Sequence, residues 1–274
     1  MKEFYVKLAN YIVLVSSVLV FAHASAAEKM IALSDYELHT TVQGDGDNIV
    51  LFEAGFGSDS TGWSDVIELL GSDYTAVAYS RAGLGKSGSD GKAKTIDEHL
   101  EDLASVVEAL GNGQKIVLAG HSYGGILVTE FMLAHPALVK GVVLVDPSTL
   151  TQRLAFKAVA EASVLADDTK LLAYMPPELV DQYRLLIEQM DNAEADSGNF
   201  QSDIPIAILT STKVFDEPFT FEETEQGKQI WQQLHSQLFA RFSNGMHIKT
   251  ATAGHSIQTE EPGLIVKAIQ YVSQ

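Results

Sequence analysis

Ser122 stands at the centre of residues 120–124, which read Gly-His-Ser-Tyr-Gly. The pattern lies between an apolar run at residues 115–119 and a helix-like stretch at residues 125–133. A strand that reverses into a helix within one turn strains the serine backbone, admits only small neighbours and lifts the hydroxyl above the sheet edge. The pattern therefore predicts a nucleophilic Ser122, with an ordinary strand-to-helix turn as the alternative.

A serine hydroxyl needs a base to act as a nucleophile at neutral pH, and His255 is the predicted base. Where a serine of this kind lies between a strand and a helix, the chain order is nucleophile, acid, histidine. His255 follows a predicted final strand at residues 246–252, at the carboxyl edge where such sites form. His247 lies at the other end of that strand and is expected to be structural.

Two aspartates are candidates for the acid that orients this histidine. Asp146 directly follows the apolar run at residues 141–145, and Asp216 follows the run at residues 204–209 after a longer loop. The loop before Asp216 exceeds the usual spacing between strand and acid and has no Gly-Asp turn. Asp146 is therefore favoured, and Asp216 is the alternative acid.

Two backbone N–H groups are expected to stabilise the negative charge that forms on a carbonyl oxygen under attack. Tyr123 would begin the helix after the serine, so its N–H is free to face that oxygen. Phe56 lies between Gly55 and Gly57 in the loop that follows the apolar run at residues 48–52. Its N–H is the second predicted donor, and a plain glycine turn is the alternative.

The elements that must position these groups alternate along the chain. Predicted strands cover residues 48–52, 74–79, 115–119, 141–145 and 204–209, and predicted helices cover residues 63–70, 96–110 and 125–135. This alternation predicts an α/β fold, a doubly wound and mostly parallel sheet with helices on both faces.

Residues 148–203 interrupt this alternation with a long helical tract from residue 150 to residue 190. The tract contains Pro176-Pro177 and ends in a polar stretch. We expect it to form a helical cap over the site, inserted before the penultimate strand. A helix pair packed elsewhere is the alternative.

No cofactor or metal site is predicted. Residues 83–88 read Gly-Leu-Gly-Lys-Ser-Gly, but a loop follows them, whereas a dinucleotide-binding turn opens a helix among its glycines. Ser80 stands where a phosphate-binding loop requires its leading glycine. The chain has no cysteine, which excludes thiol nucleophiles, disulfides and cysteine-ligated zinc.

Residues 1–26 are predicted to be a signal peptide. Lys2 and Lys7 precede an apolar run at residues 11–22, and small residues that include Ala24 and Ala26 follow it. An uncleaved membrane anchor is the alternative. We expect residues 27–274 to be one exported domain, periplasmic or secreted, without a membrane span.

A net charge of −18 disfavours nucleic acid and anionic lipid, so the expected partner is a small-molecule substrate. No feature of the sequence sets the oligomeric state.

The chain resembles the α/β-hydrolase superfamily over nearly all of its mature length. The resemblance lies in four stretches, at residues 53–57 with Trp63, 79–87, 120–125 and 254–258 with Glu261-Pro262. It implies Ser122 as nucleophile, His255 as base and an oxyanion hole formed by Phe56 and Tyr123, with no cofactor. Members usually carry a histidine just before the oxyanion glycines and an aspartate where Ser80 stands; this chain has neither.

These observations predict a serine hydrolase that cleaves a small neutral acyl ester, or a related carbonyl compound, through an acyl-enzyme. Lactones, amides, thioesters and imino-peptides are related substrates that the motifs also allow. A related fold with a carboxylate nucleophile is disfavoured because Ser122 occupies that position. A non-catalytic ligand-binding protein and a cofactor-free peroxidase are the alternative functions.

Overall fold

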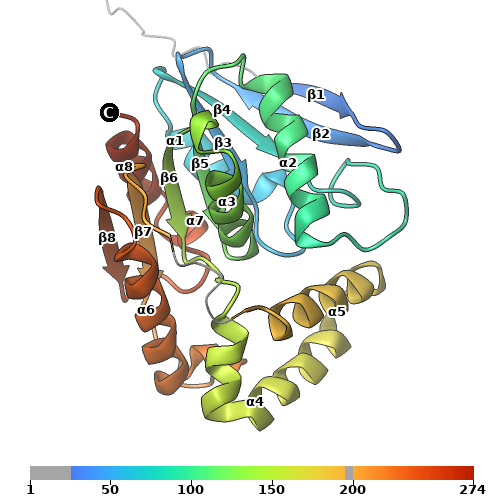
Figure 1. The fold of residues 1–274 in the computed structure, drawn as a ribbon, viewed down its shortest axis with the longest axis vertical. Helices are drawn as coiled ribbons and strands as arrows, with labels where there is room; N and C mark the ends of the chain where they lie inside the picture. The colour runs from blue at the N-terminus through green and yellow to red at the C-terminus, as the bar shows by residue number, and fades with distance from the viewer. Residues whose placement is uncertain (1–25, 195–199) are drawn as a thin grey trace, which may run out of the picture.

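An eight-stranded sheet forms the centre of the molecule in a computed structural model that describes residues 26–194 and 200–274 (Figure 1). Residues 1–25 of the predicted signal peptide lie outside the described residues. The strands are β1 (Ala27–Ala32), β2 (Glu37–Gln43), β3 (Asn48–Glu53), β4 (Tyr74–Tyr79), β5 (Ile116–His121), β6 (Val139–Val145), β7 (Ile206–Ser211) and β8 (Gly245–Thr250).

The strand order is β1-β2-β4-β3-β5-β6-β7-β8. The pairs β1–β2 and β2–β4 are antiparallel, and the other neighbouring pairs are parallel. The predicted α/β fold with a mostly parallel sheet is confirmed. The central strands β5, β6 and β7 are almost wholly buried, which explains their continuous apolar sequences.

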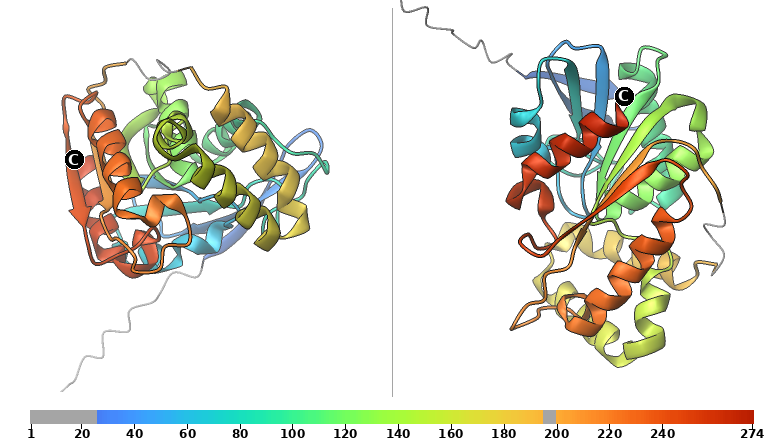
Figure 2. Two further views of the ribbon diagram at one scale, coloured as in Figure 1. Left: turned by 90° about the horizontal axis from the view of Figure 1, so that it is seen from below. Right: turned by 90° about the vertical axis from the view of Figure 1, so that its left-hand side faces the viewer.

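Helices cover both faces of this sheet (Figures 1 and 2). They are α1 (Ser64–Leu69), α2 (Ile96–Leu110), α3 (Tyr123–Ala134), α4 (Gln152–Tyr174), α5 (Pro177–Asp191), α6 (Glu225–Phe239), α7 (Ile257–Glu260) and α8 (Pro262–Val272), with short 3-10 helices η1 (Ser60–Trp63), η2 (Pro136–Leu138) and η3 (Phe221–Glu223). Trp63, Val66 and Ile269 belong to the core on the face of α1 and α8, whereas Leu103 and Phe131 belong to the core on the face of α2 and α3.

Helices α4 and α5 connect β6 to β7 and lie beyond the carboxyl ends of the parallel strands (Figure 1). Arg153 of α4 joins the two helices, because its guanidinium bonds both oxygens of Asp168 at 2.9 and 2.7 Å and reaches Asp191 of α5 at 2.8 Å. Tyr183 of α5 donates a further hydrogen bond to Asp168 at 2.9 Å. This polar network fixes the two helices against one another above the sheet.

Five strands and α-helices of the fold were not among the predicted elements, namely β1, β2, α6, α7 and α8. Strands β1 and β2 extend the sheet at one edge, and β1 has a single buried residue, Ile31, so its sequence carries little strand pattern. Helix α6 has a mostly polar sequence, but it buries Lys228, Trp231 and His235 at helical spacing. None of the helices in the described ranges is long and apolar enough to cross a membrane.

Candidate active site

Ser122 lies in the turn between β5 and α3 in a strained conformation, with φ 52° and ψ −121°. A methyl group on Gly120 would lie 2.4 Å from the Gly124 carbonyl oxygen, and one on Gly124 would lie 2.4 Å from the Glu53 carbonyl oxygen. The turn is therefore closed to any larger residue at either position, as the sequence pattern predicts. The Ser122 N–H donates to the Val145 carbonyl at 3.2 Å, which ties the turn to the end of β6.

The structure brings His255 and Asp146 together at this edge of the sheet. The His255 Nδ1 and the Asp146 Oδ2 are 2.8 Å apart, and Asp146 is fully buried with φ 40°. The other carboxylate oxygen, Oδ1, accepts hydrogen bonds from the Ser211 N–H and the Trp231 indole N–H, each at 2.8 Å. Asp216, the alternative acid, is exposed on the loop after β7. The geometry thus favours Asp146 as the partner of His255.

Asp146 and His255 each shift the pKa of the other. Burial alone would raise the pKa of Asp146, but the hydrogen bond and charge of His255 lower it to about 2. Burial lowers the pKa of His255, whereas the hydrogen bond to Asp146 and the charges of Glu222 and Asp146 raise it above its ordinary value of 6.5 overall. The pair therefore stabilises an ionised aspartate beside an imidazole that accepts a proton readily.

Phe56 and Tyr123 lie close to each other, with ring centroids 6.3 Å apart. Tyr123 is the first residue of α3, so no earlier turn of the helix can accept its N–H. Phe56 follows Gly55, where a methyl group would lie 2.9 Å from His121 Nδ1 and 3.4 Å from the Ser122 Cβ. This close approach brings the loop of Phe56 beside the serine, where two backbone donors can face one oxyanion.

A buried ion pair shapes that loop and was not assigned a role from the sequence. Arg81, which is 3% exposed, binds the Glu53 carboxylate and donates to the carbonyl oxygens of Ala54 and Gly55. Tyr79 donates to the same carboxylate. The sequence feature that could have revealed this ion pair is Glu53 itself, a charged residue that directly follows four apolar residues at the end of β3. In this chain Glu53 and Arg81 hold the loop that carries Phe56.

A cavity of about 400 Å³ opens over Ser122 and His255, between the sheet and the helices α4 and α5. Its apolar wall includes Phe156, Leu186 and Met190. The charged lining residues are Arg153, Asp167, Asp168, Glu222 and Glu223. Because carboxylates outnumber the single guanidinium, the cavity disfavours an anionic ligand.

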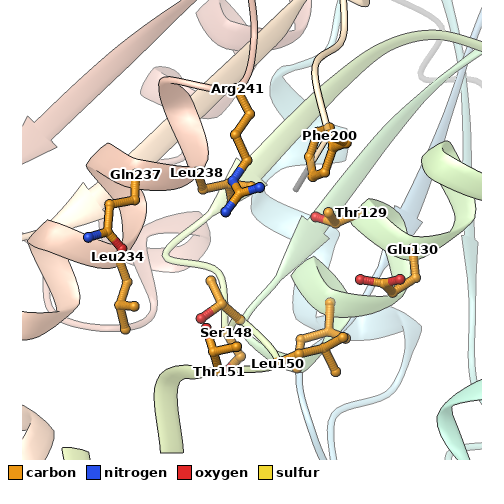
Figure 3. Close-up of a pocket in the computed structure, with 12 residues that line it drawn as sticks. Thr129, Glu130, Ser148, Leu150, Thr151, Phe200, Leu234, Gln237, Leu238 and Arg241 are labelled. Carbon is orange, nitrogen blue, oxygen red and sulfur yellow. The ribbon is translucent and has the colours of Figure 1, made fainter. Parts of the chain in front are cut away.

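Two further cavities border this site. One, of about 380 Å³, lies beyond Phe56 and Tyr123 and reaches Arg81 and α5. The other measures about 70 Å³ and lies between α3, α6 and the start of the cap, where the Arg241 guanidinium extends toward Phe200 and Thr129 (Figure 3). Neither has Ser122 or His255 in its wall, so the 400 Å³ cavity is the candidate substrate site.

Among the described residues, Asp146, Glu222 and His255 form one grouping of the side-chain types that bind metals, with ligand atoms within 4.8 Å of one another. The Lys228 ammonium lies 3.0 Å from Glu222, and it supplies positive charge at this point. We therefore interpret the grouping as a charge network around the imidazole and not as a set of metal ligands.

His247 and the glycine-rich residues 83–88 lie away from Ser122 and His255. His247 is in β8, and its Nε2 is 2.7 Å from the Thr210 hydroxyl. Residues 83–88 lie in the loop between β4 and α2, and α2 begins only at Ile96. That loop has no helix opening among its glycines, which is the feature a dinucleotide-binding turn needs.

The strand order, the serine turn after β5 and the two helical layers define the α/β-hydrolase fold. The sequence matches the Alpha/beta hydrolase family over residues 49–268. The chain belongs to this family, a family of hydrolytic enzymes.

The chain is also similar to individual proteins. The chain is 24% identical to the uncharacterized protein YqjL of Bacillus subtilis over 245 residues. These aligned residues cover 88% of this chain and 90% of YqjL. It is 27% identical to strigolactone esterase D14 of Arabidopsis thaliana over 112 residues, and this aligned part covers 39% of this chain and 42% of the esterase. The crystal structure of naproxen esterase from Bacillus subtilis superposes with a TM-score of 0.59 at 18% identity, over 90% of this chain and 91% of the esterase. This last likeness concerns the fold.

Proposed function

We propose that this protein is a serine hydrolase that cleaves small neutral acyl esters, or related carbonyl compounds, through an acyl-enzyme. The observation that carries the proposal is the 2.8 Å contact between His255 and Asp146 in the same cavity as the strained Ser122. A strained serine beside an oriented imidazole is the arrangement that activates a hydroxyl.

In this mechanism the Ser122 Oγ attacks the substrate carbonyl carbon while His255 takes the hydroxyl proton. Asp146 accepts from the Nδ1–H, which holds the imidazole with its other nitrogen free to take that proton. The N–H groups of Phe56 and Tyr123 stabilise the oxyanion. His255 then protonates the leaving alcohol, and water attacks the acyl-enzyme with His255 again as the base.

The cavity supports the proposed substrate class. A volume of about 400 Å³ lies in the range that holds small organic ligands. Its apolar wall suits an acyl chain, and its carboxylates disfavour an acid as the substrate. A neutral ester that would release its acid as an anion matches this charge distribution.

A fluorophosphonate probe tests the nucleophile directly, because the activated Ser122 oxygen would displace fluoride and form a bond to phosphorus. We expect mass spectrometry to place the label on Ser122 and expect Ser122→Ala to abolish labelling without loss of fold. A folded wild-type protein that resists the probe would overturn the proposal. Retention of an unaltered ligand would then favour a binding protein, and halide oxidation by peroxide in acetate buffer would favour a peroxidase.

Export is a separate part of the proposal. The predicted cleavage precedes Ala27, so the mature protein should begin at that residue. Mass spectrometry of the protein's N-terminal peptide, from the periplasmic or medium fraction of its native host, checks both the site and the compartment. An intact N-terminus on membrane-bound protein would contradict export and favour an anchor.

A further inference from the structure

Glu222 lies beside the proposed base, and the mechanism described above does not use it. It belongs to the 3-10 helix η3 and lines the 400 Å³ cavity. One oxygen of Glu222, one oxygen of Asp146 and one ring nitrogen of His255 lie within 4.8 Å of one another. A second carboxylate therefore faces the imidazole at a distance where charge matters.

Lys228 holds this carboxylate in place. Its ammonium is 3.0 Å from the Glu222 Oε1 and 5.6 Å from the centroid of the Trp231 ring, and the Lys228 side chain is 2% exposed. Trp231 in turn donates to Asp146. The buried ammonium therefore anchors Glu222 beside Trp231, whose indole N–H binds the orienting acid.

The backbone fixes the position of η3 as well. A methyl group on Gly227 of α6 would lie 2.0 Å from the Phe221 carbonyl oxygen and 2.7 Å from the Glu222 Cα, so η3 rests directly on the α6 backbone. The Phe221 N–H donates to Asp167 of the cap helix α4 at 2.6 Å. Glu222 is thus held between α6 and the cap and is not part of a free loop.

The titratable groups that face His255 come from β5, the end of β6, η3 and α6. Asp146 follows β6 and Glu222 is on η3, each with one negative charge; Lys228 on α6 carries one positive charge. His121 on β5 has its ring centroid 4.7 Å from that of His255, and burial lowers the pKa of His121 to about 3, so it is neutral near pH 7. The surroundings of His255 therefore carry one net negative charge.

We propose that Glu222 is a positioning residue that offsets the buried charge of Lys228 and thereby stabilises the imidazolium of His255. The inference rests on the proposed function. When Ser122 Oγ bonds to the carbonyl carbon, its proton moves to His255 and the ring becomes a cation. With Glu222 present, this cation and its surroundings sum to zero charge; without it, Lys228 leaves a net positive charge beside the forming imidazolium.

Three variants separate this electrostatic role from a structural one. Glu222→Gln removes a negative charge and should lower the pKa of His255 by about one unit, whereas Lys228→Met removes a positive charge and should raise it by about as much. The double variant restores the net charge and should return the pKa close to that of the wild type. Glu217 is an exposed carboxylate on the loop before η3. Its replacement, Glu217→Gln, is the matched control and should leave the pKa of His255 unchanged.

The pKa of His255 can be measured by NMR titration of its Cε1 proton, which requires no substrate. The pH dependence of fluorophosphonate labelling should shift in the same directions, and Glu222→Gln should slow labelling at its plateau by about tenfold. An unchanged pKa in folded Glu222→Gln would overturn the inference. If that variant does not fold, comparing Lys228→Met with the double variant isolates the same carboxylate, and equal pKa values there would overturn it as well.

The proposed function and this inference fail in different ways. Absence of a label on wild-type Ser122 removes the serine mechanism whatever Glu222 does. Normal labelling of Ser122, combined with a His255 pKa that ignores Glu222 and Lys228, leaves the serine mechanism intact and removes only the role of Glu222.

Discussion

Replacing Asp146 with asparagine should leave the shape of the site intact and reverse a single hydrogen bond. The Oδ1 atom receives two fixed N–H donors, from Ser211 and Trp231, each at 2.8 Å. The asparagine carbonyl must therefore occupy that position, because an NH2 group there would face two donors. The NH2 group then falls where Oδ2 now meets His255 Nδ1 at 2.8 Å.

An NH2 donor at this point requires His255 Nδ1 to be an acceptor, which moves the ring proton to the other nitrogen. That nitrogen could no longer take the proton of Ser122. In a serine protease the same replacement lowers the catalytic rate about 10⁴-fold, which corresponds to about 5 kcal/mol of transition-state stabilisation. We expect a loss of that size for Asp146→Asn. The hydrogen bond and charge of His255 hold the pKa of Asp146 below its usual value, so loss of the carboxylate should also lower the free energy of unfolding near pH 7.

The rate of p-nitrophenyl ester hydrolysis and the second-order rate constant of fluorophosphonate labelling measure this loss. Asp216→Asn, in which the alternative and exposed acid is changed, is the matched control and should alter both rates by less than about twofold. The role of Asp146 is contradicted if folded Asp146→Asn keeps more than about a tenth of either wild-type rate, because the wrong tautomer should leave only about 10⁻⁴ of it. It is equally refuted if Asp216→Asn loses as much activity as Asp146→Asn.

Other changes examine the surroundings of the site. Gly120→Ala places a methyl group 2.4 Å from a backbone carbonyl oxygen and should lower both the thermal unfolding midpoint and the labelling rate; Gly71→Ala, which meets nothing within 4 Å, should change neither. Arg81→Met leaves its buried carboxylate partner unpaired and should lower the free energy of unfolding by about 3–5 kcal/mol in urea denaturation. Arg184→Met removes only an exposed ion pair, and an equal loss there would contradict this account. His255 must be neutral to accept a proton, and its pKa is raised above 6.5. Activity should therefore fall as the pH drops through a value above 6.5. A fall that begins only below 6.5 would count against His255 as the base.

Much of the fold could be predicted because its central elements carry strong patterns. The strand predicted at residues 74–79 and the helix predicted at residues 96–110 match β4 and α2 in both bounds. The capping box of Thr95 and Glu98 explains the sharp start of α2. Strand β1 and helix α6 were missed, because one is mostly exposed and the other has a polar sequence whose buried face includes a lysine and a histidine.

Part of the site could also be predicted, because it too depends on a strong local pattern. Ser122 stands in a local turn whose steric demands are written in its flanking glycines. The choice between Asp146 and Asp216 could not be made locally, because it depends on which strand end lies nearest His255. The register of β6 with β7 and the N–H groups of Ser211 and Trp231 decide that Asp146 meets the imidazole.

Features that depend on neighbouring residues could be predicted from the sequence: the serine turn, the alternation of strands and helices, the helical tract after β6 and the absence of cysteine chemistry. Features that depend on residues far apart in the chain became apparent only in the folded structure. It paired Asp146 with His255, buried Arg81 against Glu53 under the loop of Phe56, and brought Glu222 and Lys228 beside the imidazole. This difference arises because a turn or a helix is selected by local sterics and periodicity, whereas a charge pair forms only when packing of the whole sheet and its helices brings the two groups together.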